Sequence, residues 1–122
     1  MIVIRWVLGQ IILLVDFITS PKPVIRETLA QKAIDDATAS MSMYQFKACP
    51  FCVKVRRQFK RHALHIELRD AKKEGEFKEE LIREGGRHKV PCLRIEKADS
   101  SVKWLYESND IIAHLKSQFN LT

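Results

Sequence analysis

The chain is poor in cysteine, and its cysteines do not have the number or spacing of a disulfide framework. Its 122 residues contain three, at Cys49, Cys52 and Cys92. Three cysteines do not make the disulfide scaffold of a small secreted domain. A structural zinc site needs two further ligands at recognisable spacing, and Cys92 and the four histidines form no second paired motif. We therefore expect no metal ion, although half of a metal site and a pair of inert core cysteines remain alternative interpretations of Cys49 and Cys52.

Aromatic residues are also scarce, at 8% of the chain, and this bears on how its basic charge is interpreted. The net charge of +6 falls within residues 42–122, because the charges of the preceding residues cancel. Six basic residues surround the first two cysteines: Lys47, Lys54, Arg56, Arg57, Lys60 and Arg61. Without stacking aromatics or a known binding motif, this cluster predicts no nucleic-acid partner. A positive field that favours a thiolate and an anionic thiol substrate accounts for it, and a solvated helix face is the simpler alternative.

What the chain does contain is a C-x-x-C pair, Cys49-Pro50-Phe51-Cys52, between a strand-like stretch at 43–46 and a basic helix. In that setting the pair indicates a redox dithiol. Unpaired N–H groups and the positive end of the helix dipole stabilise a thiolate on the first cysteine, and proline fits the first helical position. Thiols in such motifs titrate at roughly 3.5 to 7.5 instead of about 8.5. We expect Cys49 to be an exposed nucleophile at the helix cap and Cys52 to lie one turn further in.

The longest apolar run lies at the start of the chain. Residues 2–19 contain few polar side chains, with Arg5 and Asp16 near opposite ends. As a helix they would extend about 27 Å, close to the hydrocarbon thickness of roughly 30 Å. We predict a single-pass membrane anchor over residues 1–20, with the C-terminal domain on the cytoplasmic side. A helix lying in the plane of the interface and a cleaved signal peptide remain alternatives, although no cleavage site follows the apolar run closely.

The remaining chain divides into a linker and one domain. Residues 21–41 are predicted to be a partly helical linker, with its helix over 24–39, and residues 42–122 to be the domain. The domain's predicted elements are strand 43–47, helix 50–62, strand 64–69, helix 74–85, strands 90–95 and 102–106, and helix 109–119. Gly85-Gly86 ends the second of these helices, and Asp99-Ser100-Ser101 forms a turn. The order β-α-β-α-β-β-α predicts an α/β fold with a mixed four-stranded sheet and helices on both faces.

Three motifs and the order in which they follow one another resemble the glutaredoxin group of the thioredoxin superfamily. They are Cys49-Pro50-Phe51-Cys52, Lys89-Val90-Pro91 before a strand, and Glu107-Ser108-Asn109-Asp110 at the last helix. The third is more similar to the N-terminal domain of glutathione transferases, and the sequence around the cysteines is similar to the second type of microsomal prostaglandin E synthase. Bacterial glutaredoxin-like proteins with a membrane tether also resemble this chain. The resemblance implies a thioredoxin/glutaredoxin fold and, with the apolar run, a protein of a bacterial inner membrane.

The resemblance also implies how glutathione would bind as a co-substrate. It places a cis peptide bond before Pro91, so that the Val90 backbone pairs with the cysteinyl part of glutathione. It assigns Glu107 and Ser108 to the γ-glutamyl end, although Ser108 is also expected to cap the last helix. Lys47 is one residue closer to the first cysteine than the lysine of common glutaredoxins, so it serves either the glycyl carboxylate or the thiol. Phe51 keeps the packing ring of the commoner tyrosine.

These implications give three hypotheses of different classes. The first is a glutathione-dependent thiol–disulfide oxidoreductase that uses Cys49 and Cys52 to reduce protein disulfides or glutathionylated proteins near a membrane. The second is a membrane-tethered module that binds an iron–sulfur cluster together with glutathione. The third is a non-enzymatic adaptor related to glutathione transferases, against which the retained thiols argue. Cys92 is expected to lie in the core, with a catalytic role as the alternative, and His88 is expected to be a loop histidine with no role, with an approach to the site as the alternative.

Overall fold

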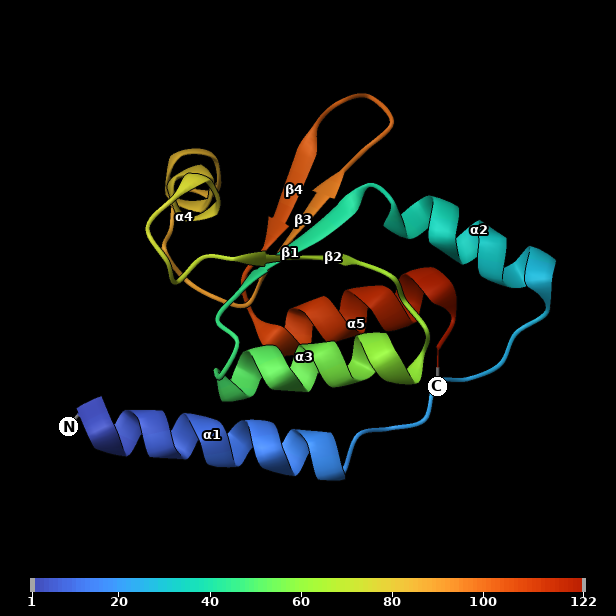
Figure 1. Ribbon diagram of the computed structural model, residues 1–122. Helices are drawn as coiled ribbons and strands as arrows, with labels where there is room; N and C mark the ends of the chain where they lie inside the picture. Colours follow the sequence, from blue (N-terminus) through green and yellow to red (C-terminus); the bar gives the residue numbers. More distant parts are fainter. Residues whose placement is uncertain (1, 122) are drawn as a thin grey trace.

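The computed structural model describes residues 2–121, in which two N-terminal helices precede a sheet with helices on both faces (Figure 1). The N-terminal helices are α1 (Ile2–Ile18) and α2 (Thr28–Thr38). The strands are β1 (Met41–Gln45), β2 (Glu67–Asp70), β3 (Cys92–Glu96) and β4 (Val102–Leu105). The remaining helices are α3 (Pro50–Arg61), α4 (Glu76–Glu80), the π-helical turn η1 (Leu81–Gly85) and α5 (Ser108–Phe119). The predicted β-α-β-α-β-β-α order is confirmed.

The four strands form one mixed sheet in the order β2-β1-β3-β4. β1 pairs in parallel with β2 and antiparallel with β3, and β3 pairs antiparallel with β4. The parallel pair is joined through α3, as a crossover connection requires. This topology fits a thioredoxin-like α/β fold. In the β1–β3 register Tyr44 lies opposite Cys92, so the carboxyl end of β1 lies next to the start of β3, at the same end of the two central strands.

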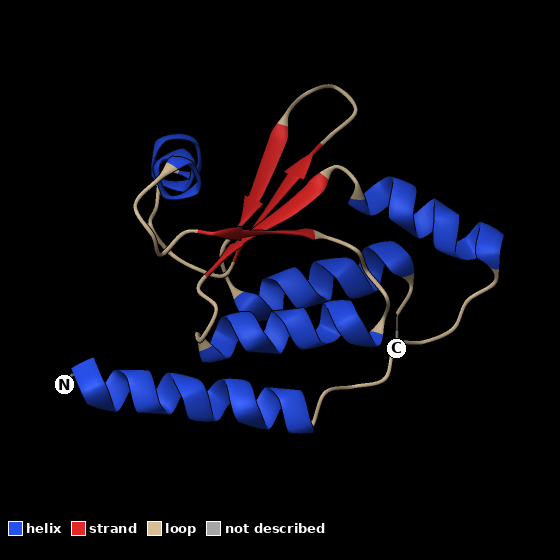
Figure 2. Ribbon diagram, viewed as in Figure 1, coloured by secondary structure: helices blue, strands red, loops and turns tan. Residues whose placement is uncertain are grey.

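The alternation of side chains along the strands builds a core on each face of the sheet. On one face, Met43 of β1 and Leu93 of β3 pack against α3 and α5, and all these core residues are buried (Figure 2). On the other face, Tyr44 and Cys92 pack against Leu81 of η1. The prediction of helices on both faces is therefore confirmed. The two cores fix α3 under the sheet and hold the ends of β1 and β3 together.

Several element boundaries differ from the predicted ones. β2 begins at Glu67 rather than at 64, because the chain leaves α3 through Ala63 (φ 51°) and Leu64 donates its N–H to Phe59 O at 2.8 Å. Leu64 is apolar because it enters the core, not because it belongs to a strand. β3 begins after Pro91, which has no N–H to donate to a sheet. The predicted stop at Gly86 is confirmed by its left-handed conformation (φ 86°).

The predicted transmembrane helix is corrected by the structure. α1 has 17 residues and extends about 26 Å, one residue less than the stretch predicted to span. It lies along α3 (Figure 1), and an added Cβ on Gly9 would come within 3.0 Å of Ala48 Cβ. Across residues 2–121, no helix combines the length and the apolar character that crossing a membrane requires. Met1 of the predicted anchor lies outside the described residues.

The second N-terminal helix is shorter than predicted and lies against the domain. α2 starts at Thr28 instead of at 24, because the preceding residues are extended and Val24 donates its N–H to Arg61 O, at the carboxyl end of α3. Ile34 packs against the core, and Gln31 donates to Ala63 O at 2.9 Å. α2 thus packs on the domain as an additional helix at the edge of the sheet.

Candidate functional site

The candidate site begins at the junction of β1 and α3. Cys49 is the N-cap residue of α3 with extended backbone (φ −73°, ψ 126°), and Pro50 occupies the first helical position. The Cys49 carbonyl accepts the first helical hydrogen bond, from Val53 N at 2.9 Å. The Cys49 side chain is half-buried and carries a free thiol. Its sulfur therefore lies at the positive end of the α3 dipole and is partly open to a reactant.

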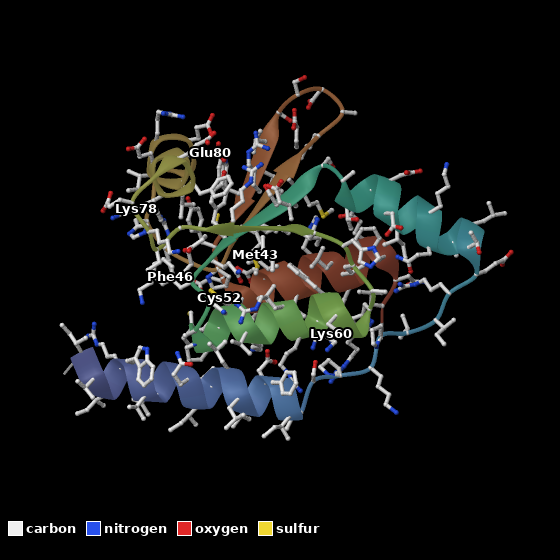
Figure 3. All side chains as sticks on the ribbon, viewed as in Figure 1. Met43, Phe46, Cys52, Lys60, Lys78 and Glu80 are labelled. Atoms are coloured by element: carbon white, nitrogen blue, oxygen red, sulfur yellow. The ribbon has the colours of Figure 1, made fainter. Side chains whose placement is uncertain are left out.

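The second thiol is one turn inside the helix and fully shielded. Cys52 has an exposed fraction of 0%, and Figure 3 shows it beneath Phe46 at the start of α3. The pKa of the Cys52 thiol is raised to about 12, first by burial and then by the charge and hydrogen bond of the neighbouring Cys49 side chain, while a hydrogen bond with the Phe46 backbone acts in the opposite direction. At neutral pH Cys52 is a thiol with its proton. The two sulfurs thus differ in accessibility while lying within hydrogen-bonding reach.

This difference predicts selective alkylation. In the folded, reduced protein at pH 7, iodoacetamide is expected to modify Cys49 and to leave Cys52 and Cys92 unmodified, because both are fully buried and have pKa values raised to about 12. Peptide mass mapping after a short pulse measures the three positions separately. In denaturant all three should react at similar rates. Modification of Cys52 as fast as that of Cys49 in the folded protein would contradict the assignment of the outer thiol.

The loop before β3 completes the site from the other side. The Val90–Pro91 peptide bond is cis, as the resemblance implied, and Pro91 is buried. Val90 and Phe46 both pack against the core formed around Tyr44 and Cys92. Because Tyr44 and Cys92 are register partners, this loop lies at the end of the sheet where β1 leads into the segment before Cys49. Phe46, whose carbonyl accepts a hydrogen bond from Cys49 N at 3.3 Å, thus connects the core beside the cis-proline loop with the segment that leads to the thiol pair.

His88 has a positional role in this loop. Its ring packs against Phe46 with the centroids 5.6 Å apart, and Nε2 lies 2.9 Å from Ala71 O. These two contacts join the loop before β3 to the segment after β1 and to the end of β2. His88 therefore makes structural contacts that the expectation of a loop histidine with no role did not include.

The γ-glutamyl candidates lie at the start of α5. Glu107 is exposed and accepts a hydrogen bond from Lys89 Nζ at 2.5 Å, and this ion pair lowers the pKa of the Glu107 carboxyl. It connects the loop before β3 to α5. The expected cap is wrong, because Glu107 is the N-cap residue, its side chain makes no cap hydrogen bond, and Ser108 is already helical. Ser108 is buried at the first position of α5.

The remaining predicted residues, Phe51 and Lys47, are exposed on either side of Cys49 in the sequence. Phe51 is 61% exposed on the outer side of α3. Lys47 is exposed and lines a cleft between α1 and α3, together with Arg56, which donates to Lys47 O at 2.7 Å. Arg56 also donates to Gln45 Oε1 at 2.6 Å, so it fixes the backbone that leads from β1 to Cys49.

Two cations near Cys49 were missed by the sequence analysis. Cys49, Phe46 and Ala48 line a cavity of about 260 Å³ whose other residues include Arg5 of α1 and Lys72 after β2. Arg5 was assigned to a membrane anchor, and Lys72 follows β2 without any motif. No signal in the sequence placed either beside the thiol, because both positions depend on how α1 and β2 pack around α3.

The third cysteine belongs to the core, as predicted. Cys92 is fully buried and packs with Tyr44 and Leu81. Burial raises the pKa of its thiol to about 12, while a hydrogen bond with Tyr106 acts in the opposite direction. Among residues 2–121 there is no group of three or more histidine, cysteine, aspartate or glutamate side chains arranged to hold a metal ion.

Comparison with known families finds one similarity, over the middle of the chain. Residues 41–98 match the family model of glutaredoxin, a range that runs from β1 through β3 and contains both the C-x-x-C motif and the cis-proline loop. No curated protein matches the chain. No solved structure matches it either. The thiol pair at the start of α3 and the mixed sheet beside it agree with this similarity to glutaredoxins of the thioredoxin superfamily.

Proposed function

We propose that this chain is a glutathione-dependent thiol–disulfide oxidoreductase that reduces disulfide-containing or glutathionylated proteins. Thiol–disulfide chemistry in general follows from the glutaredoxin match. The observation that carries the finer proposal is the contrast between its two thiols. A half-buried Cys49 at a helix N-terminus stands next to a Cys52 that burial keeps protonated. This contrast supports Cys49 as the attacking sulfur and Cys52 as the resolving thiol.

In the proposed reaction, the Cys49 thiolate attacks the glutathione sulfur of a glutathionylated protein. A Cys49–glutathione disulfide forms, and the protein sulfur leaves as a thiolate that takes up a proton. A second glutathione thiolate then attacks the bound glutathione sulfur, which releases oxidised glutathione and regenerates the Cys49 thiolate. Alternatively Cys52 loses its proton and attacks Cys49, which releases reduced glutathione and leaves a Cys49–Cys52 disulfide for two further glutathione molecules to reduce.

The start of α5 supports glutathione as the co-substrate. The γ-glutamyl end of glutathione carries an ammonium and a carboxylate, and the Glu107–Lys89 pair offers one charge of each sign. Ser108 and the first N–H groups of α5 add donors for the carboxylate. We propose that the Val90 backbone binds the cysteinyl part, that Lys47 binds the glycyl carboxylate and that Phe51 packs beside the ligand.

We also propose that the reaction takes place at the cytoplasmic side of a membrane. Large apolar side chains are exposed along the whole of α1, from Ile2 (84%) to Ile18 (70%). Contiguous apolar surface of this kind marks an interaction site. Arg5 and Asp16 break the run but lie on the side of α1 that faces the domain. A reducing cytoplasm supplies the glutathione that the cycle consumes.

Turnover on a glutathionylated peptide and on a protein disulfide tests the proposal. With reduced glutathione present, the wild-type protein is expected to act on both substrates. Cys52→Ser should retain activity on the glutathionylated peptide and lose most activity on the protein disulfide, because only the latter needs an internal resolving thiol. Release of oxidised glutathione, coupled to a glutathione reductase, is the measurement. Turnover that does not depend on glutathione would contradict the proposed co-substrate.

A further inference from the structure

We infer that α1 lies in the plane of an anionic lipid bilayer, with its outer face among the lipids and the cationic clefts beneath it bound to headgroup phosphates. This inference rests on the proposed membrane location and names the lipid chemistry that α1 recognises. The aliphatic face of α1 takes no part in the proposed thiol chemistry, whereas the clefts share Lys47 with the proposed glutathione site and Arg5 and Lys72 with the cavity beside Cys49.

The residues of α1 divide into two faces. The half-buried or buried positions recur every three or four residues along the side that faces α3: Gly9, Ile12, Leu13, Asp16 and, after the helix, Ser20. The positions opposite them are exposed and all aliphatic: Ile4, Val7, Ile11, Leu14 and Ile18. An amphipathic helix with one wholly apolar face suits a membrane interface. The side of α1 opposite the aliphatic face packs against its own domain, so the aliphatic face is the side left exposed.

Contacts with α3 and with the loop before it hold α1 against the domain. Gly9 allows the close approach to Ala48, because an added Cβ would come within 3.0 Å of Ala48 Cβ. At the other end Arg57 Nη1 donates to Asp16 Oδ1 at 3.1 Å and Arg57 Nη2 donates to Thr19 O at 2.9 Å. Lys60 donates to Ser20 Oγ. The aliphatic face is therefore presented as one continuous outer side of the molecule, along the lower edge of Figure 1.

The clefts on the domain-facing side of α1 are cationic. One has a volume of about 430 Å³ and is lined by Lys47, Arg56, Arg57 and Lys60, with Asp16 as its acidic residue. Arg57 is paired with Asp16, which leaves the other three cations in excess. A second cleft of about 360 Å³, near the start of α1, is lined by Arg5 and Lys72. Lys60 marks the position of the first cleft at the far end of α3 in Figure 3.

The position of these clefts, on the side of α1 opposite its aliphatic face, fits the layering of a bilayer. Helix diameter is about 10 Å with side chains, and interfacial helices insert about 5–10 Å into the headgroup and acyl boundary. With the aliphatic face inserted, the clefts on the opposite side of α1 lie at the level of the phosphates. Each lysine or arginine near an anionic surface contributes about 1 kcal/mol of binding. The charge pattern therefore selects an anionic bilayer over a neutral one.

The pattern disfavours a second copy of the chain as the occupant of this face. The spacing Ile4, Val7, Ile11, Leu14, Ile18 is that of a coiled-coil seam, which normally has charged residues along both sides. Here the flanking exposed positions include Val3, Leu8 and Val15. The apolar surface is thus wider than a helix-pairing seam and suits the fluid interior of a lipid layer.

Vesicle flotation of the full-length reduced protein tests the inference. The expected result is binding to vesicles of phosphatidylcholine mixed with phosphatidylglycerol, weak binding to phosphatidylcholine alone, and loss of binding at high salt. The double variant Ile11→Ser/Leu14→Ser should bind at least about tenfold more weakly. Its matched control is Ile82→Ser, which removes an exposed apolar side chain from η1 instead of from α1.

The cationic clefts are tested by a second pair of variants. Lys60→Gln should weaken binding to the anionic vesicles about fivefold, whereas Lys97→Gln in the β3–β4 turn should leave it unchanged.

Each other outcome overturns the inference in a distinct way. Equal binding to neutral and anionic vesicles would leave the membrane location standing and remove the anionic recognition. No binding to either, with a dimer in sedimentation that Ile11→Ser/Leu14→Ser dissolves, would assign the face to a second copy and remove the membrane location as well. Circular dichroism and thiol–disulfide turnover in solution verify that each variant is folded, and they test the oxidoreductase proposal separately.

Discussion

Replacement of Cys49 by serine is expected to lower thiol–disulfide turnover by on the order of a thousandfold or more, to the background of the assay. Cys49 is the half-buried thiol at the N-terminus of α3, and the other two thiols are fully buried. Serine keeps the size and the helix cap, so the loss would reflect the sulfur rather than the fold. The measurement is glutathione-dependent reduction of a glutathionylated peptide, with Tm recorded in parallel.

The matched control for this variant is Cys92→Ala. Cys92 packs in the core beside Tyr44 and Leu81, so removing its sulfur should leave turnover within a few-fold of wild type. If Cys49→Ser retained wild-type turnover while Cys92→Ala lost it, the nucleophile would be the thiol next to the cis-proline, and the assignment of Cys49 would be wrong.

The central fold could be predicted because local and long-range signals agree there. Pro50 after Cys49 marks a helix start, and alternating apolar residues mark β1 and β3. The prediction misplaced β2 because Leu64 and Ile66 have the pattern of a strand but enter the core before strand pairing begins. Periodicity reports which side chains are buried, and it does not distinguish burial in a loop from burial in a sheet.

The N-terminal region could not be predicted because its hydrophobicity has two explanations. An apolar helix can cross a membrane, or it can cover part of a domain and present its other side outward. The choice depends on tertiary contacts such as Arg57 with Asp16, whose residues are far apart in sequence. The docking of α2 likewise depends on the hydrogen bond from Gln31 to Ala63 O.

The site was predicted at the residues that carry local motifs and missed where packing supplies the chemistry. The C-x-x-C pair and the proline after Val90 are visible in the sequence. The pairing of Lys89 with Glu107 is not, because it joins two motifs through the sheet. This pairing changes the interpretation of Glu107, because its carboxylate is already paired with Lys89 when a ligand binds.

The largest expected loss of stability is from Leu93→Ala. Leu93 is fully buried in β3, lies opposite both Met43 and Leu105 in the sheet, and follows Pro91 by two residues. Truncation of a buried leucine costs about 2–5 kcal/mol of unfolding free energy, out of a total of about 5–15 kcal/mol for a typical domain. Urea unfolding monitored by circular dichroism measures the change. The same truncation at Leu68, which is 44% exposed in β2, should cost about 1 kcal/mol or less.

The cis-proline loop leads directly into β3, so Leu93→Ala should also lower turnover at temperatures where the variant remains folded. Equal losses of unfolding free energy for the two leucine variants would show that β3 does not hold the core together, and the packing described for this face of the sheet would then be wrong.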